Sequence, residues 1–232
     1  MHFNAGNFPV DIVLFGLIAL FLVLRLRSIL GKRTGLERPA VMPGPRPVPV
    51  GPVVDTRAEP VPPPTAHEIP EPSSAVGQVL NRIRDHERGF DPAEFLRGAE
   101  AAFRRIVTAY AAGDRATLRD SLTPEAFSAF DGAIAAREAE GQTQRSEIRS
   151  INQAQLLDAT LVEGGEPGGR WRASIDVRFV SDQISLLLGR DGQPVSGADA
   201  VTELADLWTF ERLLGAPKGT EPGWRLAAAR SA

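Results

Sequence analysis

The segment FDPAEFLRGAEAAFRRIVTAYAAGD, residues 90–114, decides the fold because its apolar residues recur every three or four positions. Asp91 is a favourable N-cap, Pro92 a favourable first helical residue and Glu94 the third position of a capping box. Gly113 supplies the stop. The segment therefore predicts one long helix that buries a single stripe, made of Phe95, Ala99, Phe103, Ile106 and Tyr110.

Two further helices are expected directly after this one. DRATLRDSL, residues 114–122, predicts a short helix, and Thr123 with Pro124 begins a third that runs through EAFSAFDGAIAAREAEG. Its inward-facing residues should be Phe127, Phe130 and Ile134.

After Gly141 the apolar period changes to two. In RWRASIDVRF, residues 170–179, every second residue from Trp171 to Phe179 is apolar, which predicts a half-buried antiparallel strand. Residues 147–165 change phase between Leu156 and Leu157, which indicates a β-bulge or a sharp bend. Turns are expected at 163–169 and 190–197, and further strands at 203–214 and 223–230. Helices followed by a bent antiparallel sheet indicate an α+β domain over residues 90–232.

A short amphipathic helix is expected at residues 74–89, just before this domain. Val76, Val79, Leu80 and Ile83 recur there at helical spacing among charged residues. The stripe either caps the domain core or lies on a membrane or a partner, and the sequence leaves both interpretations open.

A proline-rich segment precedes that helix. Residues 39–73 hold 12 of the 19 prolines in the chain, so they predict a disordered, extended linker. Its PRPVP and PPPT motifs fit either a simple spacer or a ligand for an aromatic-lined groove on a partner.

The amino-terminal segment predicts a membrane anchor within residues 1–38. The run PVDIVLFGLIALFLVL, residues 9–24, has no charge from residue 12 onward, and a helix over residues 8–26 would span about 28 Å, close to the ~30 Å core of a bilayer. A buried core helix is the alternative, but no second segment is apolar enough to pack against it. The residues expected to span the membrane are Ile12, Val13, Leu14, Phe15, Leu17, Ile18, Leu20, Phe21, Leu22, Val23 and Leu24.

Basic residues after the span predict its orientation. Met1–Asn7 contains no Lys or Arg, whereas a collar of four cations follows the span: Arg25, Arg27, Lys32 and Arg33. The positive-inside rule then leaves the amino terminus outside and the carboxyl-terminal domain in the cytoplasm, and the collar should attract anionic lipids.

Composition excludes several kinds of site. The chain has no cysteine, and residues 90–232 contain 16 Lys or Arg against 21 Asp or Glu, which disfavours nucleic acid as a partner. His2, His67 and His86 all precede residue 90, so the domain has no histidine for catalysis or metal binding. We therefore expect no cofactor, no metal and no enzyme. Five aromatic residues form plain core or line a pocket for a small apolar ligand: Phe103, Trp171, Phe179, Trp208 and Phe210.

Several motifs in this order resemble the Tim44-like domain family: FD at 90–91, FL.GA..AF..I at 95–106, GD at 113–114, F..AI..R at 130–137 and D.WTFER…W.L at 206–226. The span and the following LRLRSILGKRTG are similar to membrane-anchored bacterial members, termed TimA. The resemblance implies a cystatin-like cone of the nuclear-transport-factor-two superfamily, in which a curved sheet wraps a long helix and leaves an apolar pocket.

The resemblance also implies a function. The mitochondrial relative is a peripheral inner-membrane subunit that tethers a heat-shock chaperone to the protein-import channel and is associated with cardiolipin-type lipids. Its long charged amino-terminal region is replaced here by the predicted span and linker, so membrane location carries over better than chaperone tethering. The resemblance to TimA implies the inner (cytoplasmic) membrane of a bacterium as the location. We expect an adaptor or scaffold there that binds proteins, in protein translocation or membrane-protein assembly. The alternative is a pocket-based binder or sensor of a lipid-like ligand.

Overall fold

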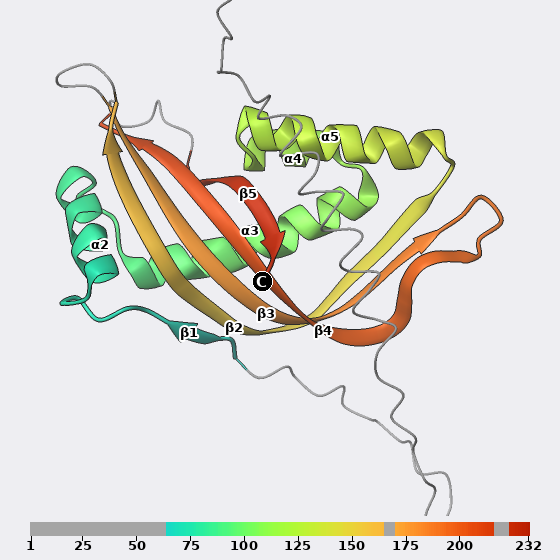
Figure 1. The fold of residues 1–232 in the computed structure, drawn as a ribbon, viewed down its shortest axis with the longest axis horizontal. Helices are drawn as coiled ribbons and strands as arrows, with labels where there is room; N and C mark the ends of the chain where they lie inside the picture. The colour runs from blue at the N-terminus through green and yellow to red at the C-terminus, as the bar shows by residue number, and fades with distance from the viewer. Residues whose placement is uncertain (1–63, 165–169, 216–222) are drawn as a thin grey trace, which may run out of the picture.

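The computed structural model describes residues 64–164, 170–215 and 223–232. Over these residues the chain forms an α+β fold of four helices and a curved five-stranded sheet (Figure 1). The helices are α2 (Ala75–His86), α3 (Pro92–Ala112), α4 (Arg115–Ser121) and α5 (Pro124–Ala139). The strands are β1 (Ala66–Glu68), β2 (Thr143–Glu163), β3 (Trp171–Leu188), β4 (Pro194–Leu214) and β5 (Arg225–Ser231). The predicted α+β class with a curved sheet is confirmed.

Helix α3 begins and ends where the sequence predicts. The Asp91 carboxylate accepts hydrogen bonds from the backbone N–H groups of Ala93 and Glu94, both at 2.9 Å. Gly113 ends the helix with φ 72°, a left-handed conformation that glycine adopts without steric cost. The Glu94 carboxylate contacts Arg97, its neighbour one turn along the helix. Helices α4 and α5 likewise lie where the sequence predicts helices, and they begin after the N-caps Asp114 and Thr123.

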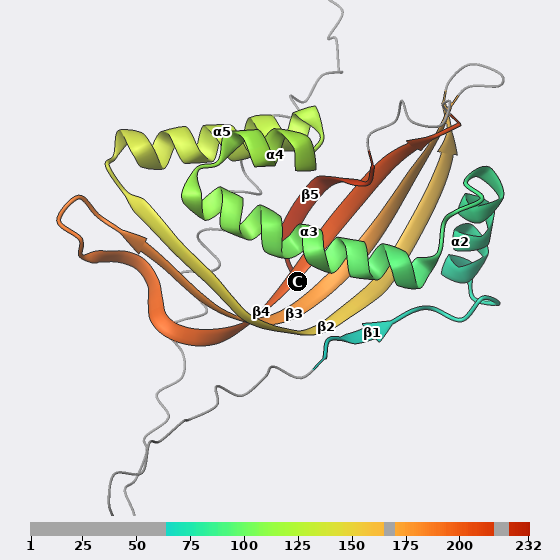
Figure 2. The ribbon, with the colours of Figure 1, turned by 180° about the vertical axis from the view of Figure 1, so that it is seen from behind.

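The sheet is ordered β1-β2-β3-β4-β5, and β2 to β5 form an antiparallel meander. β1 joins the outer edge of β2 in parallel. The register between β2 and β3 shifts at three places, one of them between Leu156 and Asp158, which confirms the bulge predicted at Leu157. Such bulges bend a strand, and the sheet curves around α3, which crosses its concave face (Figure 2).

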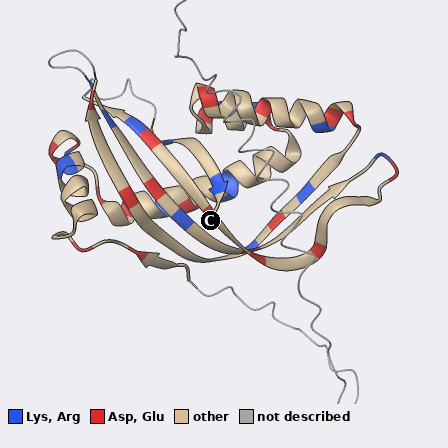
Figure 3. Ribbon diagram, in the orientation of Figure 1, with Lys and Arg blue, Asp and Glu red and all other residues tan. Residues whose placement is uncertain are grey.

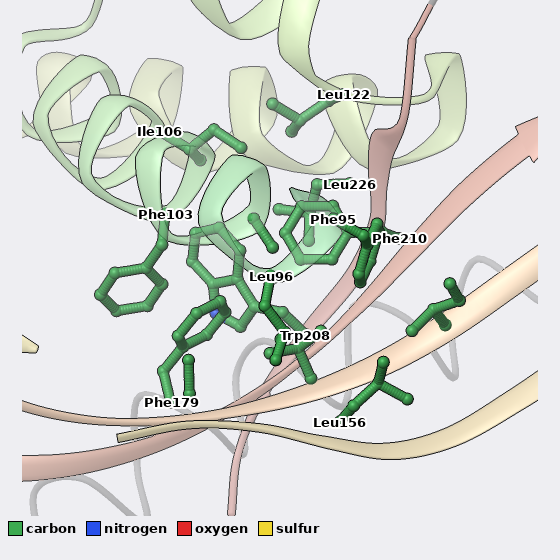
Figure 4. Close-up of a cluster of buried hydrophobic side chains, with 14 of the residues drawn as sticks. Phe95, Leu96, Phe103, Ile106, Leu122, Leu156, Phe179, Trp208, Phe210 and Leu226 are labelled. Atoms are coloured by element: carbon green, nitrogen blue, oxygen red, sulfur yellow. The ribbon is translucent and has the colours of Figure 1, made fainter. Parts of the chain in front are cut away.

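The core fills the space between α3 and the concave face of the sheet (Figure 4). Phe103 and Ile106 of α3 are fully buried, as are Phe179 of β3 and Leu226 of β5. Phe127 and Phe130 of α5 are only partly buried and pack against the edge of this core. The even-numbered residues of β3 from 172 to 182 lie on the convex face and are exposed or half-buried. The prediction of a strand with one buried face is therefore confirmed.

Helix α2 caps one end of the core. Leu80 and Ile83 are buried, at 2% and 0% exposure, and Val76 and Val79 pack against the same cluster. This observation supports the first of the two interpretations of the stripe, because its most buried residues face the domain.

The linker expected over residues 39–73 is structured at its carboxyl end. Residues 66–68 form β1, which pairs with Gln153–Gln155 of β2. Thr65 and His67 contact the Glu100 carboxylate of α3, at 2.9 and 3.3 Å. This departure from the prediction has a simple cause: residues 65–69 lie between Pro64 and Pro70 and contain no proline, so their N–H groups can pair with a strand.

The predicted membrane span, the basic collar and most of the linker lie outside the described residues. Residues 165–169, which belong to the turn expected at 163–169, also lie outside them. Within residues 64–164, 170–215 and 223–232, no helix combines the length and apolarity needed to cross a membrane.

Candidate functional site

Four of the five aromatic residues considered for a pocket come together as packed core. Phe103 lies at the centre, with its ring centroid 4.6 Å from those of both Phe179 and Trp208. Phe210 is 1% exposed and lies beside Trp208, with ring centroids 6.1 Å apart. Trp171 lies apart from them and contacts the ring of His86 at 4.5 Å. The space between α3 and the curved sheet is therefore filled by side chains.

A pocket remains between α3, α5 and the carboxyl-terminal part of β3, and we call it the α3–α5 pocket. Its volume is about 160 Å³, and it opens to solvent. Of the five aromatic residues above, Trp208 lines it. The helices contribute Ile106, Val107, Tyr110, Ala129, Phe130 and Ala133, and the strands contribute Gln144, Ser146, Gln183, Ser185, Leu204, Ala205, Asp206, Trp208, Ala229 and Ser231.

The two walls of this pocket differ in chemistry. Its helical wall is mainly apolar, whereas its sheet wall presents a row of amide and hydroxyl groups. The Gln144 amide accepts a hydrogen bond from Arg137 at 3.0 Å and donates one to Ser146 at 3.2 Å. The Gln183 amide donates to Ser181 at 2.8 Å and reaches Asp206 at 3.5 Å. The sheet wall is thus a pre-arranged polar surface.

Two arginines hold the elements around this pocket together. Arg137 of α5 is 9% exposed and donates to the backbone carbonyls of Tyr110 and Ala111, at 2.7 and 3.0 Å. These are carbonyls of the last turn of α3, where a cation also meets the negative end of the helix dipole. Arg190 of the β3–β4 turn donates in the same way to the carbonyls of Ala139 and Glu140, at 3.0 and 2.9 Å.

A second pocket of about 440 Å³ lies at the amino-terminal half of α3, and we call it the Trp224 pocket. Phe90, Phe95 and Trp224 form one wall with ring centroids 4.9–6.0 Å apart. The other lining residues are Glu87, Gly89, Asp91, Glu94, Gly98, Ala99, Ala101, Ala102, Arg105, Phe210 and Arg212. Glu87 Oε1 and Arg212 Nη1 form an ion pair at 2.6 Å. The other carboxylate oxygen, Glu87 Oε2, and the Arg212 Nε are buried and have no hydrogen-bond partner in the described part of the chain.

Neither pocket brings together a metal or acid–base site. Residues 64–164, 170–215 and 223–232 contain no group of three His, Cys, Asp or Glu that could hold a metal ion. Asp176 lies on the convex face of β3 and accepts a hydrogen bond from Thr209 at 2.7 Å. Asp158 lies opposite it in the register between β2 and β3. Asp206 is the one acid of these three that lines the α3–α5 pocket.

A cluster of ion pairs lies on the surface between α4 and α5. Arg115 donates to both oxygens of Glu138, at 3.1 and 2.9 Å, and to Asp131 at 2.6 Å. The hydrogen bonds from Arg115 hold the pKa of Glu138 below its ordinary value. Figure 3 shows both signs of charge interspersed over helices and strands. This coupling links two helices and lies away from either pocket.

Sequence reasoning missed the polar wall of the α3–α5 pocket. The apolar face of β3 continues past Phe179 at every second residue, and there it carries Ser181 and Gln183. Two polar residues on the buried face of a strand were the available signal, because buried polar groups need partners.

Comparison with known proteins gives one clear match. The family model for the Tim44-like domain matches residues 76–231. Among solved structures, the intermembrane-space region of the chloroplast protein ARC6 is similar, with 12% identity and a TM-score of 0.40 over 58% of this chain and 94% of that one. No curated protein sequence matches.

Proposed function

This chain belongs to the Tim44-like domain family, and we propose that it is an adaptor anchored in a membrane. The predicted span at residues 12–24 inserts in the inner membrane of a bacterium, as in TimA-type members, and the collar binds anionic lipids. The domain then lies in the cytoplasm and binds proteins there, in protein translocation or membrane-protein assembly.

The filled core is the observation that carries this proposal. Phe103 and Phe179 are fully buried and Phe210 nearly so, and they occupy the space that a large ligand inside the cone would need. No group of three His, Cys, Asp or Glu that could hold a metal ion occurs among the described residues. A domain whose centre is filled by side chains is suited to acting through its outer surface.

Charge also favours proteins over nucleic acid as partners. The domain is slightly acidic, with acidic and basic groups interspersed (Figure 3), whereas nucleic-acid binding depends on neutralising phosphates with a concentrated basic surface.

Site-specific photo-crosslinking tests the adaptor function. A photoreactive phenylalanine analogue is placed in the full chain at Arg97, Val162 or Val195, which are exposed positions on α3, β2 and β4. We expect irradiation of cells to give a discrete protein adduct from at least one position, recovered with the membranes. The same adduct should move to the soluble fraction when residues 1–38 are deleted. Absence of protein adducts at all three positions would contradict the adaptor function.

The α3–α5 pocket supports a second function, the reversible binding of a small lipid-like ligand. Its volume of about 160 Å³ and its mainly apolar helical wall are the specific observations in favour. The exposed positions Val162 and Val195 do not line this pocket, so one chain can bind both a protein and a small ligand.

A further inference from the structure

The ion pair between Glu87 and Arg212 lies in the wall of the Trp224 pocket. It joins Oε1 to Nη1, whereas Glu87 Oε2 and Arg212 Nε are closed to solvent and have no hydrogen-bond partner in the described part of the chain. Buried polar atoms without partners cost free energy. The two side chains are 22% and 25% exposed, so their ends can turn toward a ligand that supplies one N–H group and one acceptor oxygen.

The floor of this pocket is a stretch of helix α3 without bulky side chains. Gly98 and Ala101 are exposed, Ala102 is half-buried, and all three line the pocket. A Cβ atom added at Gly98 would have no heavy atom from elsewhere in the described chain within 4 Å. The main chain of a partner can therefore approach the helix closely here.

The aromatic wall supplies an apolar contact. Phe90 and Phe95 are 6% and 7% exposed, and the ring of the half-buried Trp224 lies 5.9 and 4.9 Å from theirs. Aromatic residues in such pockets are frequent anchors of protein interfaces. The volume of about 440 Å³ falls within the range of roughly 300–1,000 Å³ that is usual for ligand sites.

These features favour a peptide over a lipid or a nucleic acid. An acyl chain would cover the aromatic wall but leave Glu87 Oε2 and Arg212 Nε unpaired. A phosphate would meet three carboxylates in this lining, those of Glu87, Asp91 and Glu94, against two arginines. A residue of an extended chain has an uncharged main chain and presents its N–H and C=O on the same side, as in an antiparallel sheet. It can donate to the carboxylate and accept from the guanidinium.

We propose that the Trp224 pocket is the site where this chain holds its protein partner. An extended segment of the partner places one apolar side chain against Phe90, Phe95 and Trp224. The main-chain N–H and C=O of the same residue pair with Glu87 and Arg212. This inference rests on the adaptor function proposed above, and it adds the site and the kind of segment that is bound.

The test uses the full chain, labelled with 5-fluorotryptophan and reconstituted in nanodiscs of uncharged lipid. Of the three tryptophans, Trp224 lines the pocket whereas Trp171 and Trp208 do not, so the ¹⁹F signals separate binding there from effects elsewhere. The probe is the capped peptide acetyl-Ser-Gly-Leu-Gly-Ser-amide. One comparison peptide has serine in place of leucine, and the other has an ester oxygen in place of the leucine N–H. We expect the probe to shift the Trp224 signal at about one tenth of the free concentration that either comparison peptide requires.

Two glycine variants separate the pocket from the rest of the surface. Gly98→Leu places a side chain on the floor of the pocket and should abolish the shift. Gly132→Leu is the matched control, because Gly132 is also an exposed helical glycine with open space at its Cβ position, but it belongs to α5 and does not line this pocket. Glu87→Met removes the acceptor and should bring the probe and its ester to equal affinity. If Glu87→Met does not fold, the glycine variants and the ester still decide the result.

Photo-crosslinking in cells distinguishes a failure of this site from a failure of the adaptor function. With the photoreactive phenylalanine analogue at Arg105, an exposed residue of the pocket lining, the protein adduct should disappear in Gly98→Leu and persist in Gly132→Leu. Adducts from Val162 or Val195 without one from Arg105 would overturn this site and leave the adaptor function standing. A Trp224 shift without adducts from any position would instead contradict the adaptor function and support peptide binding by the pocket.

Three results of the peptide titration would overturn the site directly. The probe leaves the Trp224 signal unmoved, or Gly98→Leu has no effect, or the ester binds native protein as tightly as the probe does. In the last case the pocket recognises only the apolar group, as a lipid site would.

Discussion

Replacing Phe103 by alanine tests the packing on which the fold depends. The side chain is fully buried, and its ring contacts those of Phe179 and Trp208 at 4.6 Å. Removing a ring that buries about 150 Å² of apolar surface costs about 4 kcal/mol at ~25 cal/mol per Å². The residual cavity and the lost ring contacts also contribute, so we expect the free energy of unfolding to fall by about 3–5 kcal/mol.

Urea unfolding of residues 64–232 measures this loss, because every contact named above lies within that fragment. With a slope of about 2 kcal/mol/M, the unfolding midpoint should fall by about 1.5–2.5 M. The matched control is Val201→Ala, a position 55% exposed, where the midpoint should barely move. A loss below about 1 kcal/mol for Phe103→Ala would mean that the side chain is not packed against the sheet, and the account of the core would be wrong at its centre.

Four other predictions concern topology and local interactions. In intact spheroplasts an impermeant thiol reagent should label Ala5→Cys but not Ser73→Cys, and labelling of the latter would contradict a cytoplasmic domain. Changing the four collar cations to Gln should give mixed orientations in the same assay, and a uniform orientation would show that another feature sets it. Arg137→Met removes three hydrogen bonds and should lower stability by about 2–3 kcal/mol, with Arg137→Lys recovering only part, as urea titration would show. The hydrogen bonds from Arg115 lower the pKa of Glu138, so this pair adds stability above the ordinary value of 4.5 and loses it as the pH falls through the lower folded-state pKa. The stability difference between native protein and Arg115→Gln, measured by urea titration, should therefore shrink as the pH falls below about 4.5.

The sequence predicted those elements whose signals are local. Helix α3 carries its cap, its stop and its apolar stripe within residues 90–114, and the structure confirms all three. The bulge at Leu157 was equally local, because a change of phase in a strand can be seen without knowing its neighbours.

Features that depend on distant partners could not be derived in the same way. The stripe of α2 shows that one face is buried but not what covers it. β1 has only three residues, Ala-His-Glu, without alternation, and it is ordered by pairing with β2 and by the contacts with Glu100. The α3–α5 pocket depends on the distance between α5 and the sheet, which Arg137 and Arg190 maintain from elements far apart in the sequence.

The order of the elements along the chain has a consequence for biosynthesis. The stripe of α3 is made early, but the strand residues that cover it, such as Phe179 and Phe210, follow about 75 to 115 residues later. At ~5–20 residues per second, translation leaves that apolar face without its sheet for roughly 4–23 s. During this interval the nascent chain resembles a client of the cellular folding machinery, and the ribosome must complete β4 before the domain can protect its own core.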